Sequence, residues 1–99
     1  TSKITQIDSP QFKAGDLKVY PNPFSDKLNF EFVSADDAHA VLEIYNMLGQ
    51  SIERILEQQV EGGAMNRIEY KPTQIISGIY IYKLTLDGNT TVGKVIYEK

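Results

Sequence analysis

The chain has 99 residues, of which 41% are hydrophobic and 23% charged, and its formal net charge at pH 7 is -3. This length and balance fit one globular domain with a single core. Its ten lysines and arginines are scattered, which excludes a nucleic-acid partner because phosphate neutralisation needs clustered cations. No apolar run approaches the roughly 20 residues that span a bilayer, so we expect no membrane insertion. The absence of cysteine excludes disulfides and thiolate chemistry.

The first sixteen residues show no sustained periodicity and contain proline and glycine, so we predict that 1–16 is a linker or flexible arm from a preceding domain. The domain proper is then 17–99. The chain begins at Thr1 rather than at methionine, and we expect it to be a piece of a longer protein.

Alternation of apolar and polar residues predicts strands along the rest of the chain. Leu17–Tyr20 makes a short first strand that "PNP" at 21–23 ends, because the two prolines fix φ and lack N–H donors. In "DKLNFEFVS" at 26–34, apolar and polar residues alternate with period two, which predicts a second strand with one buried face. A third strand follows in "HAVLEIYNM", with Leu42 and Ile44 on one face.

The second half of the chain continues in the same way. The Gly-containing turn "LGQ" at 48–50 leads into a fourth strand at 51–56, and we predict a polar loop at 57–66 and a fifth strand at 66–71. From Gly78 the sequence predicts a long hairpin in which four apolar side chains share a face, namely Tyr80, Tyr82, Leu84 and Leu86. Seven short strands without a helical period predict an all-β, immunoglobulin-like sandwich of antiparallel strands.

Few residues in the chain are suited to catalysis or metal binding. His39 is the single histidine, and with Asp36 and Asp37 beside it the segment reads as a polar turn, so we predict neither a catalytic group nor a metal site nor a cofactor. No serine lies in a nucleophile-elbow pattern, and the glycines form no phosphate-binding motif. Asn89-Thr90-Thr91 matches a glycosylation acceptor, but it lies at a predicted hairpin tip, where asparagine suits the turn.

Three stretches occur in order: "VYPNPFSDKLNFEF", "LEIYNMLGQSIERI" and "GIYIYKLTLDGNTTVGKVIYEK". Together they resemble the C-terminal sorting domain of cargo proteins of the type IX secretion system (Por secretion system) of Bacteroidetes-type bacteria, and the resemblance covers 17–99. It implies an immunoglobulin-like sandwich that acts as the C-terminal secretion signal of a larger cargo protein. The implied partners are the outer-membrane translocon and its shuttle proteins. The implied location is the periplasm in transit, then the cell surface or the medium.

The resemblance also implies that a sortase-like signal peptidase removes the domain at the cell surface, with a cut in or near residues 1–16. The positions that match the family's motifs are Pro21, Asn22, Pro23, Leu48, Gly49, Gln50, Gly78, Tyr80, Lys94, Val95 and Ile96. Turn chemistry and ordinary edge-strand charges are the alternative explanation for each of them.

We assign recognition, as a hypothesis, to the terminal hairpin, because its last strand is expected at a sheet edge with no closing cap and therefore open to strand addition. The competing function is an adhesion or carbohydrate-binding module. Its motivation is the number of tyrosines at strand positions, although aromatic residues there more commonly pack in a core.

Overall fold

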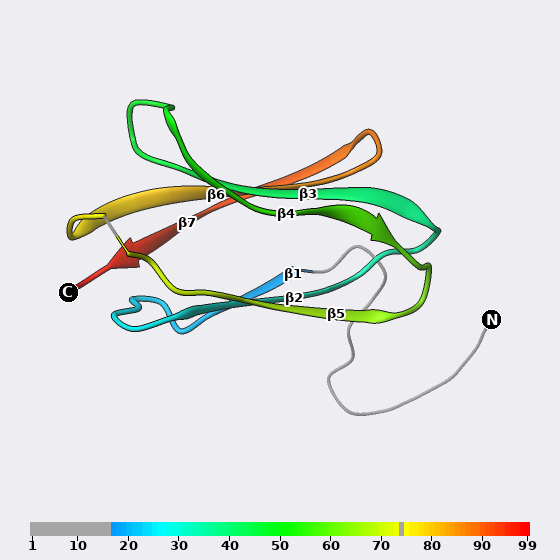
Figure 1. Cartoon of the computed structure of the whole chain (residues 1–99), viewed down its shortest axis with the longest axis horizontal. Helices are drawn as coiled ribbons and strands as arrows, with labels where there is room; N and C mark the ends of the chain where they lie inside the picture. The colour runs from blue at the N-terminus through cyan, green and yellow to red at the C-terminus, as the bar shows by residue number, and fades with distance from the viewer. Residues whose placement is uncertain (1–16, 74) are drawn as a thin grey trace.

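Seven antiparallel strands form two sheets in the computed structural model, which describes residues 17–73 and 75–99 (Figure 1). The three-stranded sheet has the order β1 (Leu17–Tyr20), β2 (Leu28–Val33), β5 (Met65–Tyr70). The four-stranded sheet has the order β4 (Ser51–Val60), β3 (Ala38–Tyr45), β6 (Gly78–Leu86), β7 (Asn89–Tyr97). The predicted all-β, immunoglobulin-like sandwich is therefore confirmed. The predicted arm 1–16 lies outside the described residues.

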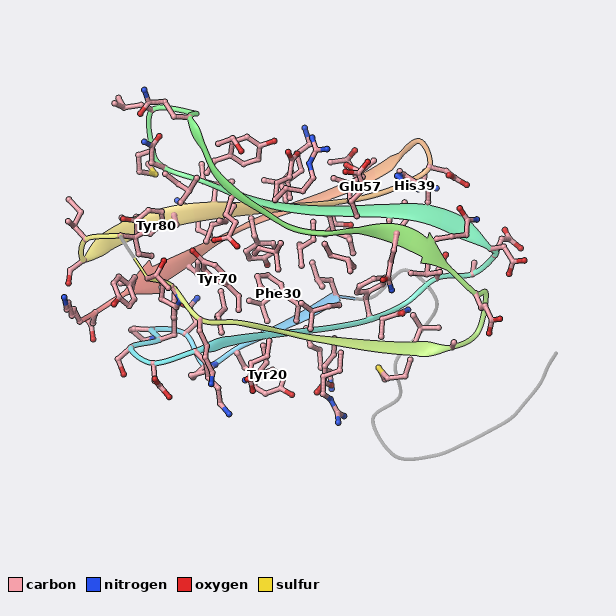
Figure 2. All side chains as sticks on the ribbon, viewed as in Figure 1. Tyr20, Phe30, His39, Glu57, Tyr70 and Tyr80 are labelled. Atoms are coloured by element: carbon pink, nitrogen blue, oxygen red, sulfur yellow. The ribbon has the colours of Figure 1, made fainter. Side chains whose placement is uncertain are left out.

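The core lies between the two sheets and follows the alternation seen in the sequence. Phe30 and Phe32 of β2 are fully buried, as are Leu42 and Ile44 of β3 on the facing sheet. Phe30 meets Tyr82 of β6 edge to face with ring centroids 5.7 Å apart, so the contact joins the two layers. Figure 2 places Phe30 between the sheets. Among the described residues, none lies in a helix that could cross a membrane.

The fourth strand is longer than predicted. We expected a loop at 57–66, but β4 continues to Val60 and β5 begins at Met65, so the loop prediction was wrong at both of its ends. The polar residues at the end of β4 pair with β3 without a register shift, with Glu57 opposite Val41 and Val60 opposite Ala38, whereas the register shifts twice nearer the hairpin turn. β4 is an edge strand with most side chains in solvent, and such a strand needs no apolar alternation.

At the end of the sandwich where β2 leads into β3, two loops are held together by hydrogen bonds. The Gly63 N–H donates to the carbonyl oxygen of Ser34 at 2.8 Å, and the Gly62 N–H donates to Asp37 Oδ1 at 2.8 Å. A Cβ built on Gly62 would lie 2.8 Å from the Cα of Asp36. Only glycine allows this close approach of the two loops.

In the last hairpin, Tyr82 of β6 lies directly opposite Gly93 of β7. A Cβ built on Gly93 would be 2.1 Å from the Tyr82 hydroxyl oxygen, so the ring occupies the space that a side chain on β7 would fill. The Tyr82 ring therefore needs a glycine opposite it on β7, and Gly93 is the residue at that position.

We expect Gly62→Ala to destabilise the domain by about 1–3 kcal/mol, because the new methyl group collides with backbone atoms, which cannot move aside as a flexible side chain can. Gly88→Ala is the matched control, since a Cβ there has no atom within 4 Å, and it should change stability by less than about 0.5 kcal/mol. Urea unfolding of both variants measures this. Equal stability of the two variants would contradict the close packing of these loops.

Tyr70 gives a prediction about pH. Burial, with a smaller contribution from the charge of Glu53, raises the pKa of the Tyr70 hydroxyl to about 12. The fold therefore favours the neutral phenol. The neutral Tyr70 side chain contributes its full share to the stability of the fold below about pH 10, the pKa of tyrosine in the unfolded chain. This contribution is lost as the pH rises towards 12.

We expect the free energy of unfolding to fall with pH more steeply in the wild type than in Tyr70→Phe. The difference between the two slopes should reach up to about 1.4 kcal/mol per pH unit over this range. Urea unfolding of both proteins at pH 9, 10 and 11 measures the difference, and the shared response of the other tyrosines cancels in the comparison. Parallel pH profiles would show that Tyr70 does not resist ionisation.

Candidate recognition site

The terminal strand β7 is an edge strand, as predicted, because it pairs on one side with β6 and ends the four-stranded sheet. The "PNP" turn that follows β1 lies against the end of this strand. The Asn22 side chain bridges the strand: the Ile96 N–H donates to Asn22 Oδ1 at 2.9 Å, and Asn22 Nδ2 donates to the carbonyl oxygen of Lys94 at 3.3 Å. Asn22 thus takes the place that a neighbouring strand would occupy.

Phe24 continues this pairing through its backbone. Its N–H donates to the Ile96 carbonyl oxygen at 2.9 Å, and the Glu98 N–H donates to the Phe24 carbonyl oxygen at 2.8 Å. The Phe24 ring is buried and packs on the ring of Tyr97 with centroids 5.1 Å apart. The expectation that the last strand has no closing cap was therefore wrong: residues 22 and 24 close its edge from Lys94 to Glu98. We call this contact the Asn22 clasp.

The first part of the β7 edge is not covered by any other strand that the structure describes. In an antiparallel strand, the backbone N–H and C=O groups of successive residues point alternately to the two sides of the strand. The groups of Lys94, Ile96 and Glu98 that form hydrogen bonds with residues 22 and 24 point away from β6. The pairing of β7 with β6 has no register shift, so the N–H and C=O groups of Thr90 and Val92 point the same way. Within the described part of the chain they have no backbone partner.

Of the other predicted residues, some lie in the core and others lie in turns or on the surface. Gly78 and Tyr80 begin β6 and pair with Tyr97 and Val95, and Tyr80 is buried with its hydroxyl donating to the Ile76 carbonyl oxygen at 2.6 Å. Val95 is 1% exposed and belongs to the core. Gly49 lies in the β3–β4 hairpin with a φ of 85°, a conformation that glycine adopts without strain. Lys94 and Ile96 face solvent from β7.

All of these positions gather at one end of the sandwich. The turns after β1 and β3, the start of β6 and the end of β7 lie together in Figure 1, on the side where the C-terminus is marked. Leu17 lies at the other end, because it pairs with Phe32 near the end of β2. Four segments therefore lie at one end of the sandwich. Backbone pairing joins the start of β6 to the end of β7, and the clasp joins the turn after β1 to the end of β7.

Sequence reasoning missed Phe24 as part of this site. The signal was present, because an apolar residue directly after two prolines is out of place in an exposed turn. The bridging role of Asn22 is harder to find, since its partner Ile96 is 74 positions away.

The polar clusters elsewhere hold the strands together. Glu31 on the outer face of β2 accepts hydrogen bonds from the Tyr20 hydroxyl and from Arg67 Nε, the latter at 2.8 Å. The hydrogen bond from Tyr20, followed by the guanidinium of Arg67, lowers the pKa of the Glu31 carboxyl. His39 faces Glu57 at 3.4 Å on the outside of the other sheet (Figure 2). These pairs of side chains on neighbouring strands explain the polar residues by their contribution to sheet stability, so no role in a chemical reaction is needed to explain them.

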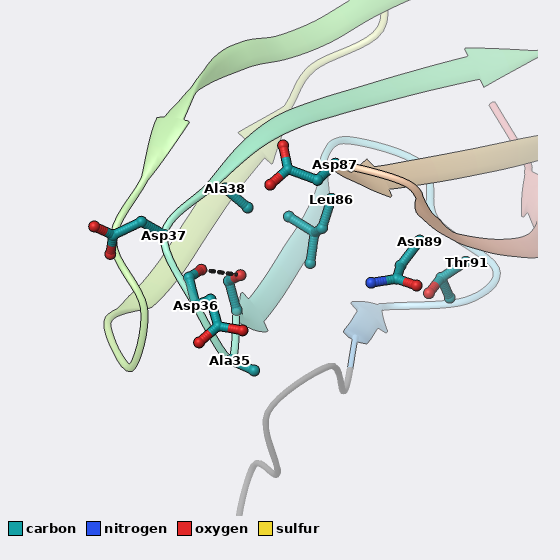
Figure 3. A pocket seen from close by; sticks show the side chains of 9 residues that line it. Ala35, Asp36, Asp37, Ala38, Leu86, Asp87, Asn89 and Thr91 are labelled. Carbon is teal, nitrogen blue, oxygen red and sulfur yellow. Dashed lines mark hydrogen bonds between the residues drawn. The ribbon is translucent and has the colours of Figure 1, made fainter.

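A hollow of about 310 Å³ opens at the end of the sandwich opposite the clasp (Figure 3). Asp36, Asp37 and Asp87 lie around it, but Asp37 and Asp87 already accept backbone N–H groups from Gly62 and His39. Among the residues that the structure describes, no three histidine, aspartate or glutamate side chains converge as metal ligands would.

We expect Asn22→Ala to remove both bonds of the bridge and lower stability by about 1–2 kcal/mol, with faster hydrogen exchange at the Ile96 amide. Asn22→Asp keeps the acceptor and should preserve most of the protection at Ile96. Amide exchange followed by NMR measures both. An Ile96 amide that stays equally protected in Asn22→Ala would contradict the clasp.

Comparison with known proteins identifies the family of this chain and a protein of similar fold. The family model described as "Secretion system C-terminal sorting domain" matches residues 18–98. No curated protein matches the sequence. A crystal structure of dimeric latent PorU from Porphyromonas gingivalis is similar in fold, with a TM-score of 0.67 and 22% sequence identity over 83% of this chain and 9% of that chain. This chain thus corresponds to a small part of that protein. Since the family model spans nearly all described strands, the chain belongs to the secretion system C-terminal sorting domains, the signals that direct cargo through the type IX system.

Proposed function

We propose that the open edge of β7 is where the outer-membrane translocon of the type IX system, or one of its shuttle proteins, binds this sorting domain. The observation that carries the proposal concerns 17–73 and 75–99: within these residues, Thr90 and Val92 have no backbone partner on the outer edge of β7, next to the part that the Asn22 clasp closes. A partner that adds a strand there would satisfy the free backbone groups and stop where the turn begins. The clasp thus defines one limit of the binding surface.

The proposal includes the route of the cargo. The cargo precedes the domain, crosses the periplasm, is recognised at the outer membrane and reaches the cell surface or the medium, where a sortase-like signal peptidase cuts in or near residues 1–16. Supporting this, Leu17 lies at the end of the sandwich away from the clasp. A bulky cargo attached there would leave the clasp end of the sandwich accessible.

We also propose that the domain acts by being recognised and not by catalysis. Several charged side chains are engaged with neighbours, such as Arg54, which pairs with Glu43 of β3 at 3.2 Å and with Glu57 of its own strand at 2.7 Å. The competing sugar-binding function would need an exposed aromatic platform. Tyr70, Tyr80 and Tyr97 are at most 6% exposed, and Tyr82 packs on Phe30 in the core.

A proline at position 92 tests the open edge. Val92→Pro removes an N–H that points away from β6, so the hairpin ladder stays intact while strand addition is blocked. In a bacterium with a type IX system, a reporter fused ahead of residues 1–99 should be exported at least tenfold less with Val92→Pro than with wild type. Secreted and cell-retained reporter are quantified by immunoblot.

Val92→Thr is the matched control, since it keeps the N–H and nearly the same shape, and its export should equal that of wild type. Circular dichroism and thermal unfolding of the purified Val92→Pro domain establish that it is folded. Normal export of a folded Val92→Pro fusion would overturn edge binding, while export of a reporter without residues 17–99 would overturn the sorting function itself.

A further inference from the structure

The β3–β4 hairpin ends in a tip, residues 46–50, that is held by its own hydrogen bonds. The Asn46 side-chain oxygen accepts the N–H groups of Leu48 at 2.9 Å and of Gln50 at 3.0 Å. Asn46 Nδ2 donates to Gln50 Oε1 at 2.7 Å, and the Gly49 N–H donates to the Asn46 carbonyl oxygen at 3.0 Å. The tip therefore has one defined shape and needs no partner for these backbone groups.

This fixed tip exposes two large apolar side chains. Leu48 is 83% exposed and Met47 is 57% exposed. A hairpin turn on the surface is normally built from polar residues, and neither side chain packs on the hydrophobic core. In Figure 1 the hairpin extends beyond the body of the sandwich at the end that also carries the clasp. The fold thus presents an apolar projection at the same end of the sandwich as the clasp.

We propose that Leu48, with Met47 beside it, is a second recognition element that inserts into an apolar pocket of a folded protein of the export machinery. This inference rests on the proposed sorting function and adds a contact separate from the β7 edge. A side chain on a preformed turn loses little conformational freedom when it binds, which favours insertion into a pocket of matching shape.

The chemistry of the hairpin favours a protein pocket over a lipid surface. Elements that bind anionic lipid surfaces combine several apolar side chains with lysines or arginines. Residues 46–53 carry no cation, and they end in Glu53. The next residue, Arg54, is already bound to Glu43 and Glu57. Two apolar side chains on an uncharged turn can fill one pocket, but they are a weak anchor for a negatively charged membrane.

The test uses the same reporter fusion with residues 1–99 in a bacterium that has a type IX system. We expect Leu48→Ser to lower the initial rate of export about tenfold, as burial of one leucine side chain implies, and Leu48→Met to stay near wild type. Ile76→Ser is the matched control, because Ile76 is 79% exposed in the loop before β6 and should leave export unchanged. Thermal unfolding of each purified domain verifies that the variants are folded.

Each other outcome overturns the proposal. Wild-type export of folded Leu48→Ser, in cells where deletion of 17–99 abolishes export, would refute the role of the tip and leave the sorting function intact. An equal loss with Ile76→Ser would show that apolar surface in general, and not this tip, matters. Flotation of the purified domain with phosphatidylethanolamine–phosphatidylglycerol vesicles gives the lipid result: Leu48-dependent binding to vesicles would refute a protein pocket.

Discussion

Hydrogen bonds between the turn after β1 and the end of β7 tie the two sheets to each other through the backbone. The sheets of a sandwich usually meet through side chains alone, which leaves their edges independent. Here Asn22 and Phe24, which belong to the connection between β1 and β2, occupy the edge of the opposite sheet. The buried Phe24 ring fixes this arrangement from the inside by its contact with Tyr97. The proline turn and the terminal strand are therefore one structural unit.

Much of the fold follows from local sequence patterns. The alternation in β2 and β3 predicts which side chains are buried, because burial on one face requires period two. The same pattern fails for β4, whose polar residues pair with β3 although neither face shows a continuous apolar stripe. The position of β7 at an edge also follows from the chain order of the strands. Its closure by Asn22 does not, because a contact across 74 positions leaves no local signal.

The candidate site residues were proposed from the sequence as a set, but their arrangement in space was not predicted. The motif positions Asn22, Gly49 and Lys94 are far apart in sequence, and the antiparallel topology brings their turns and strand ends to the same side of the sandwich. The roles within the set differ. Val95 and Tyr80 stabilise the core, whereas Lys94 and Leu48 face outward. The candidate residues of this chain therefore include both buried core positions and solvent-exposed positions.

Gly93 of β7, which faces the Tyr82 ring, fixes the alignment of the terminal strand with β6. A slip of the final hairpin by two residues would keep the buried face inward but would place Thr91 or Val95 where the ring now lies, and neither leaves room for it. The hairpin therefore has a single alignment. The amide and carbonyl groups on the outer edge of β7 therefore lie at fixed distances from the Asn22 clasp, because the packing of the Tyr82 ring on Gly93 fixes the alignment of β7 with β6.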